Sequence, residues 1–265
     1  MSKETSETTQ LLHGKSAVIT GGASGIGLAI ATAFARQGAS VHIVDLNEQG
    51  ARAAAQSITS SGGRAESWAC DVADAASVRQ VFDRIFDRGP VHILVNNAGV
   101  AHVGTVASTN EEDFDRLMRI NVRSVYLCTR AVAEAMKQQG GGVILNMASI
   151  AATAGLPDRF AYSTTKGAVL AMTFSIARDL LQDHIRCNAI SPARVHTPFV
   201  DGFVAKNYPG REQEMMVKLG QAQPIGRMAE PSEVANLAVW LCSDQASFVT
   251  GADYPLDGGF VNLRG

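Results

Sequence analysis

The sequence predicts a doubly wound α/β fold, in which one parallel sheet carries helices on both faces. Short runs rich in β-branched residues alternate with longer helical segments along nearly the whole chain. The predicted strands are apolar throughout, as is typical of strands buried on both faces of a sheet. Glycine-rich turns end several of the helical segments, and strands that alternate with helices in this way pair in parallel.

The first half of the chain contains four pairs of strand and helix. Gly38 ends the first helix, Gly89 and Pro90 end the third, and the glycine run 140–142 ends the fourth, because glycine favours helix ends and proline cannot continue a helix. The expected strands are 15–20, 40–45, 65–72 and 91–99, and the expected helices are 25–38, 47–60, 75–88 and 111–138.

The second half continues this pattern up to residue 191. The expected strands are 142–150, 185–191 and one around 253–259, with helices over 160–182 and near 231–243. Residues 192–229 have no regular pattern and are expected to be irregular. Because they follow the carboxyl end of a strand, where such sheets bind ligands, we expect residues 194–223 to form a substrate lid.

The chain is expected to form a single domain. Its 265 residues are 46% hydrophobic, which is enough for one large core. No charge run or low-complexity linker divides residues 13–265. The polar start of the chain predicts a flexible tail over residues 1–12.

Charge and composition exclude several classes of function. The net charge of −2 provides no basic surface for nucleic acid or an anionic membrane. No apolar run approaches the roughly 18–20 residues that cross a bilayer, and no signal peptide is evident. The cysteines and histidines do not cluster at ligand spacing, which predicts reduced thiols and no metal site. We therefore expect a cytoplasmic, metal-independent protein.

A glycine-rich stretch, TGGASGIG (20–27), joins the first predicted strand to the first helix. Its glycines let the backbone approach a phosphate, while the helix N-terminus offers free N–H groups. The spacing is one residue off the G-x-G-x-x-G fingerprint, but its position between strand and helix favours dinucleotide binding over a plain turn. We assign to the cofactor site Gly21, Ser24, Gly25, Ile26 and Gly27.

Asp45 indicates which cofactor is bound. It ends the second predicted strand, where a carboxylate can accept both ribose hydroxyls of NAD and repels the extra phosphate of NADP. The structural alternative is an aspartate that only begins the next helix. Arg52 lies a turn into that helix, which is a poor position for holding a 2′-phosphate. We therefore expect NAD.

These motifs, with others further along the chain, resemble the short-chain dehydrogenase/reductase family of the Tyr-x-x-x-Lys type. The resemblance covers about residues 14–260 and implies a Rossmann fold. It is specific because all the motifs occur in the family's order. They are TGGASGIG, CDV (70–72), NNAG (96–99), Asn121 in RINV, Ser149, YSTTK (162–166), SPARVHTP (191–198) and DGG (257–259).

The resemblance also implies which residues surround the cofactor. One departure concerns Ala193, which stands where the family usually has glycine. Because alanine resists positive φ, we expect a slightly different turn over the nicotinamide. The implied cofactor contacts are Asp71 and Val72 at the adenine, Asn97, Ala98 and Gly99 on the nicotinamide side, Val195 and Thr197 at the carboxamide, and Tyr162 and Lys166.

The family's catalytic tetrad corresponds to Asn121, Ser149, Tyr162 and Lys166. Four residues apart on one helix, Tyr162 and Lys166 project on the same face. The charge of Lys166, with that of oxidised nicotinamide, is expected to lower the pKa of Tyr162, which then acts as base in oxidation and acid in reduction. Ser149 can hydrogen-bond the substrate oxygen, and the resemblance implies that Asn121 anchors a proton-relaying water.

Two arginines indicate the charge of the substrate. Arg159 precedes Tyr162 by about one helical turn, and a guanidinium suits bidentate capture of a carboxylate. The alternative is an ion pair between Arg159 and Asp158 or another carboxylate at the surface. The surrounding sequence resembles dehydrogenases of small hydroxy acids and keto-sugar acids. We assign to substrate binding Ser149, Arg159, Tyr162 and Arg194.

The expected function is an NAD-dependent dehydrogenase that oxidises a secondary alcohol of a small polar, anionic substrate, such as a sugar acid, sulfonated sugar or hydroxy acid. Neutral sugars, polyols and steroids are the alternative substrates. The nearest alternative enzyme is an NADPH-dependent 3-oxoacyl-[acyl-carrier-protein] reductase, against which Asp45 argues. A non-catalytic NAD-binding sensor would have lost the tetrad, which is intact.

The long helices predict an oligomer. Apolar residues of the segment 160–182 lie on more than one face, so that one face can cover the sheet and another can contact a second subunit. The resemblance implies a homotetramer built through these helices and the last strand.

Overall fold

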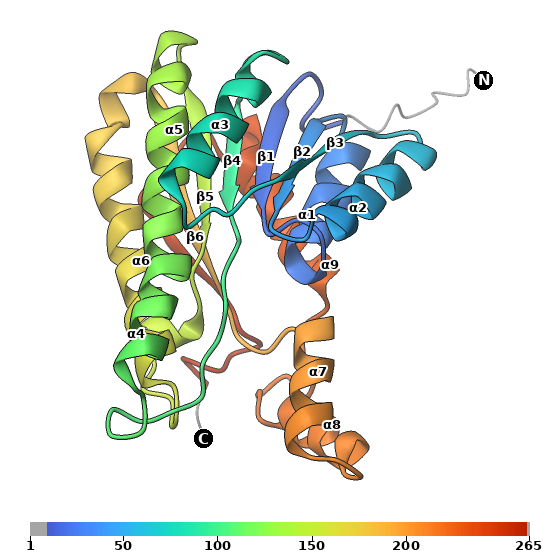
Figure 1. Ribbon diagram of the computed structural model, residues 1–265, viewed down its shortest axis with the longest axis vertical. Helices are drawn as coiled ribbons and strands as arrows, with labels where there is room; N and C mark the ends of the chain where they lie inside the picture. Colours follow the sequence, from blue (N-terminus) through green and yellow to red (C-terminus); the bar gives the residue numbers. More distant parts are fainter. Residues whose placement is uncertain (1–9, 264–265) are drawn as a thin grey trace, which may run out of the picture.

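Seven parallel strands form the central sheet of the protein (Figure 1). The structure, a computed structural model, describes residues 10–263 without the side chains of residues 199, 206 and 207. The strand order is β3-β2-β1-β4-β5-β6-β7, which confirms the doubly wound fold. The strands are β1 (Ser16–Thr20), β2 (Ser40–Asp45), β3 (Arg64–Ala69), β4 (Ile93–Asn96), β5 (Gly142–Met147), β6 (Ile185–Pro192) and β7 (Asp253–Leu256).

Helices cover both faces of this sheet, with α1, α2 and α9 on one face and α3, α5 and α6 on the other (Figure 1). Between β1 and β4 the chain changes its direction across the sheet, and such a switch point is where doubly wound sheets bind ligands. The helices are α1 (Gly25–Arg36), α2 (Glu48–Ser60), α3 (Ala75–Phe86), α4 (Glu111–Leu117), α5 (Ser124–Gln138), α6 (Phe160–Asp179), α7 (Pro198–Asn207), α8 (Glu212–Gln221) and α9 (Pro231–Cys242).

The core has two layers because the strands are apolar on both sides. Ile19 and Val95 pack into the cluster under α1 and α9, whereas Val18 and Leu94 pack into the cluster under α3 and α5. Successive side chains of a strand point to opposite faces. An unbroken apolar run in the sequence therefore corresponds to a strand that is buried on both faces.

Most of the predicted elements are confirmed, with shifts at their ends. The strand expected over 91–99 is the short β4, because the chain leaves the sheet after Asn96. The helix expected over 111–138 consists of α4, a π-helical turn (Met118–Arg123) and α5. The π-helical turn contains Asn121.

The irregular stretch expected over 192–229 is a correction, because it contains α7 and α8. Thr197 caps α7 and Pro198 is its first residue, where the fixed φ of proline suits a helix start. Glu212 and Glu214 lie in the first turn of α8, where they complement the helix dipole. These local signals favour helix even though neither segment has a long apolar stripe.

The beginning of the chain joins the domain earlier than expected. Residues 1–9 of the expected tail lie outside the described residues. Leu12 is fully buried, and its N–H donates to the carbonyl of Gln37, which follows α1. Leu11 also donates its N–H to the Gln37 side chain, so these two leucines pack on the domain. Within residues 10–263, no helix combines the length and apolarity that a membrane span requires.

Candidate active site

The glycine-rich loop between β1 and α1 is shaped by close backbone contacts. Gly21 has φ +64°, and a Cβ there would lie 2.9 Å from the Cα of Ala98. A Cβ on Gly27 would collide with the carbonyl of Gly21. Ser24 and Ile26 lie at the start of α1, and Ser24 makes no side-chain cap. The first-turn N–H groups of a helix lack intrahelical partners, so this loop can hold a phosphate group.

Asn97 ties the end of β4 to this loop. Its Nδ2 donates to the carbonyls of Thr20 and Gly21, at 3.0 Å each. The N–H groups of Asn97 and Ala98 both donate to Thr20 Oγ1, at 3.0 and 3.1 Å. The Asn97 side chain therefore fixes the loop, and Thr20, which was not among the residues expected at the site, is its partner. The sequence signal was a hydroxyl directly before the first glycine.

Asp45 lies at the end of β2, beside the glycine-rich loop. Its carboxylate accepts the N–H of Ala23 at 3.0 Å and the N–H of Asn47 at 2.9 Å. It is half-buried and keeps free lone pairs, because a carboxylate can accept about four hydrogen bonds. The structure thus places this carboxylate where the sequence predicts the adenosine ribose of a dinucleotide.

The neighbourhood of Asp45 provides little positive charge. Arg52 is paired with Glu48 at 2.7 Å on the exposed face of α2. Leu46, the residue after Asp45, has a 75% exposed side chain. On the next strand end, after β3, Val72 is buried and Asp71 is exposed, with its carboxylate accepting the N–H of Ala73.

Thr197, which caps α7, lies next to the glycine-rich loop near Gly25. A Cβ on Gly25 would lie 3.5 Å from the Thr197 Cγ2, so the start of α7 faces the start of α1. Thr197 Oγ1 accepts the N–H of Val200. Val195 is buried and pairs with Ala229 in an isolated β-bridge. These contacts bring the residues expected at the nicotinamide to the same edge of the sheet as the loop.

Asn121 is fully buried in the π-helical turn. Its Oδ1 accepts the N–H of Val100 at 2.8 Å, and its Nδ2 donates to the carbonyl of Val100 at 2.8 Å and to Thr165 Oγ1 at 3.0 Å. Both amide protons are therefore engaged within the protein. π-Helical turns occur frequently at functional sites, and here the turn aims Asn121 at the chain after β4. A Cβ on Gly99 would lie 3.2 Å from Asn121 Oδ1 and 3.7 Å from Lys166 Nζ.

Lys166 is buried, and its Nζ donates to the carbonyl of Met147 at 2.7 Å. Its Nζ also lies 5.8 Å from the centre of the Tyr162 ring. Burial lowers the pKa of Lys166 to about 8, because a low dielectric disfavours the ammonium form. No carboxylate is among the causes of this shift.

The surroundings of Tyr162 act on its pKa in both directions. Burial raises the pKa of the Tyr162 phenol, whereas its hydrogen bond with Ser149 and the charge of Arg159 lower it. Burial outweighs the other two causes, so the net shift of the Tyr162 pKa is upward. The lowering expected from Lys166 together with oxidised nicotinamide stays a prediction. Ser149 is buried, and its Oγ also accepts the N–H of Ala151 at the start of a 3₁₀ turn.

Arg159 is the cation that acts on Tyr162, and it makes no ion pair within the described residues. The alternative of an ion pair with Asp158 is therefore wrong. Arg159 instead donates to the backbone carbonyl of Asp158 at 3.0 Å. Asp158 has φ +56°, a left-handed conformation that few non-glycine residues adopt. Gly104 fixes this corner by accepting from Phe160 and donating to Asp158.

Ala193 does not adopt positive φ, and the expected difference in the turn over the nicotinamide stays a prediction. In residues 10–263 only Asp158 and His184 adopt positive φ without being glycine. The N–H of Ala193 donates to the carbonyl of Leu256 at 3.1 Å, which continues the pairing of β6 with β7. The backbone therefore continues from β6 through Ala193 to Arg194 without strain at Ala193.

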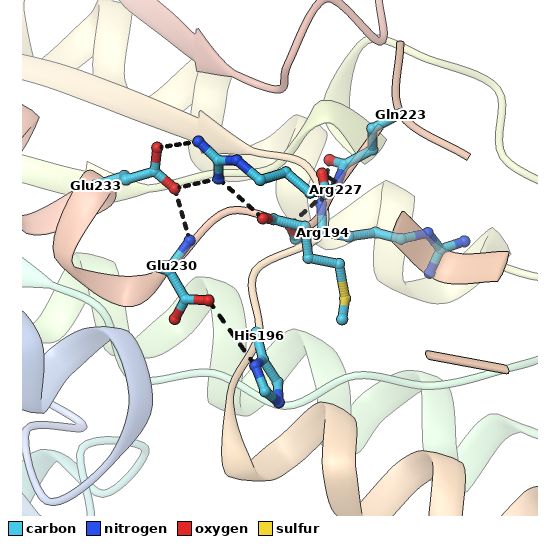
Figure 2. Close-up of polar contacts among 7 residues, drawn as sticks. Arg194, His196, Gln223, Arg227, Glu230 and Glu233 are labelled. Carbon is cyan, nitrogen blue, oxygen red and sulfur yellow. Dashed lines mark hydrogen bonds and ion pairs between the residues drawn. The ribbon is translucent and has the colours of Figure 1, made fainter. Parts of the chain in front are cut away.

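A polar network surrounds the segment that follows Arg194 (Figure 2). Arg227 makes two bonds to Glu233, at 2.7 and 2.8 Å. Glu233 also accepts the N–H of Glu230. His196 lies 2.9 Å from an oxygen of Asp201 and 4.0 Å from an oxygen of Glu230. This network joins the start of α7 to the start of α9.

The fold and this site define an oxidoreductase with a doubly wound sheet. A family model described as enoyl-(acyl carrier protein) reductase matches residues 21–261. The chain belongs to the short-chain dehydrogenase/reductase family. This confirms the family and the fold class that the sequence indicated.

Two curated relatives are similar over almost the whole chain. D-threitol dehydrogenase of Mycolicibacterium smegmatis is 41% identical over 251 residues, which cover 94% of each chain. The 2-keto-3-deoxy-L-fuconate dehydrogenase of Xanthomonas campestris is 36% identical over 252 residues, which cover 95% of this chain and 81% of the relative.

Two solved structures are similar in fold and sequence. L-sorbose reductase from Gluconobacter frateurii, complexed with NADPH and L-sorbose, has a TM-score of 0.92 and 33% identity, covering 97% of this chain and 100% of the other. A 3-ketoacyl-(acyl-carrier-protein) reductase from Brucella melitensis, complexed with NADH, has a TM-score of 0.85 and 37% identity, covering 94% and 99%. Both of these structures contain nicotinamide cofactors.

Proposed function

We propose that the protein is an NAD-dependent dehydrogenase that oxidises a secondary alcohol of a small, polar, anionic substrate related to the sugars. The observation that carries this proposal is the convergence of Tyr162, Lys166 and Ser149 at one edge of the sheet, with the glycine-rich loop and Asp45 along the same edge. The same proposal assigns Asn121, Ser149, Tyr162 and Lys166 to catalysis.

Each catalytic side chain has a separate role in removing the proton from the alcohol. Ser149 donates a hydrogen bond to the substrate oxygen and holds it beside Tyr162. The Tyr162 phenolate accepts the hydroxyl proton. Lys166, held by the carbonyl of Met147, places a positive charge near the Tyr162 ring. A bound nicotinamide ring supplies the acceptor for the hydride.

The choice of NAD over NADP is supported by the carboxylate of Asp45. A carboxylate there repels a 2′-phosphate, while Arg52 is neutralised by Glu48. The two solved relatives contain NADPH and NADH, respectively, so the family uses both cofactors. A Cβ on Gly21 or Gly27 would collide with neighbouring backbone, so these glycines keep the loop tight. A tight glycine-rich loop at a helix start suits a bound dinucleotide.

An anionic substrate is supported by Arg159 and Arg194. Neither guanidinium forms an ion pair among the described residues. The pKa of Arg194 is lowered by burial and then by the charge of Arg159, so the two cations lie close enough to repel each other. An anion between them would relieve this repulsion. The relatives named for threitol and for a keto-deoxy sugar acid favour a polyhydroxylated substrate.

The alternative function is reduction of a 3-oxoacyl group on an acyl carrier protein. It is favoured by the 37% identity to the Brucella melitensis reductase. That function predicts activity with acetoacetyl thioesters, and a preference for NADPH would support it. A non-catalytic NAD sensor has no observation in its favour.

The test of the proposed function is the initial rate of NADH formation with matched pairs of sugars and their acids and with short hydroxy acids. We expect the acids to be oxidised with the lower KM. In the Arg159→Ala variant, KM for the acids should rise by roughly 10-fold or more, as expected for a lost charge-assisted hydrogen bond. The kcat should change little. Equal turnover of neutral sugars and acids would show that the substrate is not selected by charge.

A further inference from the structure

Gln223 contacts the backbone of Arg194 although the two residues lie on different segments. Gln223 follows α8 and is 3% exposed. Its Oε1 accepts the N–H of Arg194 at 3.1 Å, and its Nε2 donates to the carbonyl of Arg194 at 3.5 Å. The same Nε2 donates to the carbonyl of Arg227 at 2.7 Å (Figure 2). One buried amide therefore contacts both backbone polar groups of Arg194.

The carbonyl of Arg194 also accepts the N–H of Ala229 at 2.9 Å, so Gln223 is the partner that holds the N–H side of the backbone from which the Arg194 side chain starts. Buried backbone groups need partners, and here the N–H group of Arg194 takes the Gln223 side chain as its partner, outside any regular strand or helix. The Arg194 guanidinium extends away from Glu230 and Glu233 (Figure 2). It therefore does not join the ion pairs of this network.

The remainder of the network holds the same region without touching Arg194. Arg227 binds Glu233 through both terminal nitrogens and donates to the carbonyl of Met228. These contacts stabilise the chain between α8 and α9. Loss of the Arg227 side chain would loosen this region and leave the Gln223 contacts with Arg194 in place.

We propose that Gln223 is a positioning residue that sets substrate specificity by fixing the direction in which Arg194 projects. The proposal rests on the proposed function of the site, in which Arg194 binds the anionic group of the substrate. Gln223 touches neither substrate nor cofactor and acts only through Arg194.

The test compares Gln223→Met, which keeps the length of the side chain and removes its hydrogen bonds, with the control Arg227→Gln. We expect Gln223→Met to raise KM for the acid by roughly 10-fold, as for a lost contact of about 1.4 kcal/mol. The kcat, KM for the matched neutral sugar and KM for NAD should stay within about two-fold. Arg227→Gln should lower Tm without this split. If Gln223→Met does not fold, Gln223→Leu, which also removes the hydrogen bonds without adding a charge, takes its place.

A double-mutant cycle then separates the two proposals. In the Arg194→Ala background, Gln223→Met should have no further effect on KM, because coupled residues are not additive. Additive effects, or equal losses with acid and neutral sugar, would overturn the role of Gln223. If the wild type does not prefer acids, the proposed substrate class fails. The double-mutant cycle is then measured as KM for the substrate with the highest kcat/KM. If no compound is oxidised, the dissociation constant of malonate from the NADH complex replaces KM.

Discussion

Tyr162 is half-buried and Lys166 is buried, and the surroundings of both side chains disfavour the charged form. Burial raises the pKa of Tyr162 and lowers that of Lys166 to about 8. Their neutral forms are thus favoured at physiological pH more than in free amino acids. If Tyr162 acts as the base, the rate of oxidation must therefore depend on pH through the fraction of phenolate.

The rate of alcohol oxidation should rise with pH. Because the pKa of Tyr162 is raised, the fraction of phenolate grows about tenfold per pH unit below that pKa. We expect log kcat/KM for oxidation to rise with a slope near one through the alkaline range, and the reverse reduction to fall above the same pH. Tyr162→Phe should lower kcat by about 10²–10⁴-fold with NAD binding retained. An alkaline limb that persists in this variant would assign the base to another group.

We expect the buried charge of Lys166 to lower the free energy of unfolding at neutral pH. Its pKa is about 8 when folded and about 10.4 when unfolded, so the unfolded chain binds more protons between these values. Stability therefore rises with pH across this window. We expect Lys166→Met to stabilise the cofactor-free protein by about 1–3 kcal/mol at pH 7, with the gain shrinking from pH 8 to 10.5.

Thermal denaturation of wild type and Lys166→Met at several pH values measures this difference. A gain of this size raises Tm by several degrees in a domain of this length. A lower Tm in the variant at pH 7 would mean that the hydrogen bond to Met147 outweighs the burial of the charge.

Single residues of the site differ in how far the sequence predicts them. Tyr162 and Lys166 are four apart on one helix, so local spacing alone brings them together. Asn97 and Gln223 bind partners 76 and 29 residues away in the chain, namely Gly21 and Arg194. Such contacts depend on the tertiary fold, and nothing in the local sequence around either residue indicates its partner.

At the scale of elements, strands were predictable where a short apolar run was continuous. The apolar strands β1, β2 and β5 are buried on both faces, and their sequence is correspondingly uninterrupted. α7 and α8 were missed because ten-residue helices without a long apolar stripe differ little from loops in composition. The π-helical turn had no signal, since its residues suit an α-helix equally well.

The ends of elements explain why the site forms at one edge of the sheet. In a parallel sheet all strand carboxyl ends lie on the same side. Asp45 at the end of β2, Asn97 after β4 and Ser149 after β5 therefore share an edge, and α1 begins beside them. The positions of the motifs after the strands indicated a cofactor site at this edge, whereas the tetrad was implied by the family resemblance.

At the scale of the whole molecule, apolar side chains remain exposed on the helices away from the sheet. Tyr126 of α5 and Phe174 of α6 are 48% and 45% exposed. Phe248, shortly before β7, is fully exposed. We propose that the surface around Tyr126 and Phe174 and the surface around Phe248 form the two contacts of a homotetramer, as the family resemblance implies.

Analytical ultracentrifugation tests this assembly. The wild type should sediment with a mass four times the 28.0 kDa of one chain. Phe174→Asp and Phe248→Asp should each produce dimers, because each would place a charge in only one of the two contacts. A wild type that remains monomeric at micromolar concentration would rule out this assembly.

The most direct test of the account is the ratio of kcat/KM for NAD to that for NADP with one alcohol substrate. The position of Asp45 at the end of β2 predicts a ratio well above ten in favour of NAD. Asp45→Ala, with Asp71→Ala as the control on the neighbouring strand end, should reduce the ratio most strongly. A wild-type enzyme that uses NADP equally well or better would contradict the assignment of Asp45 and, with it, the proposed NAD-dependent oxidation.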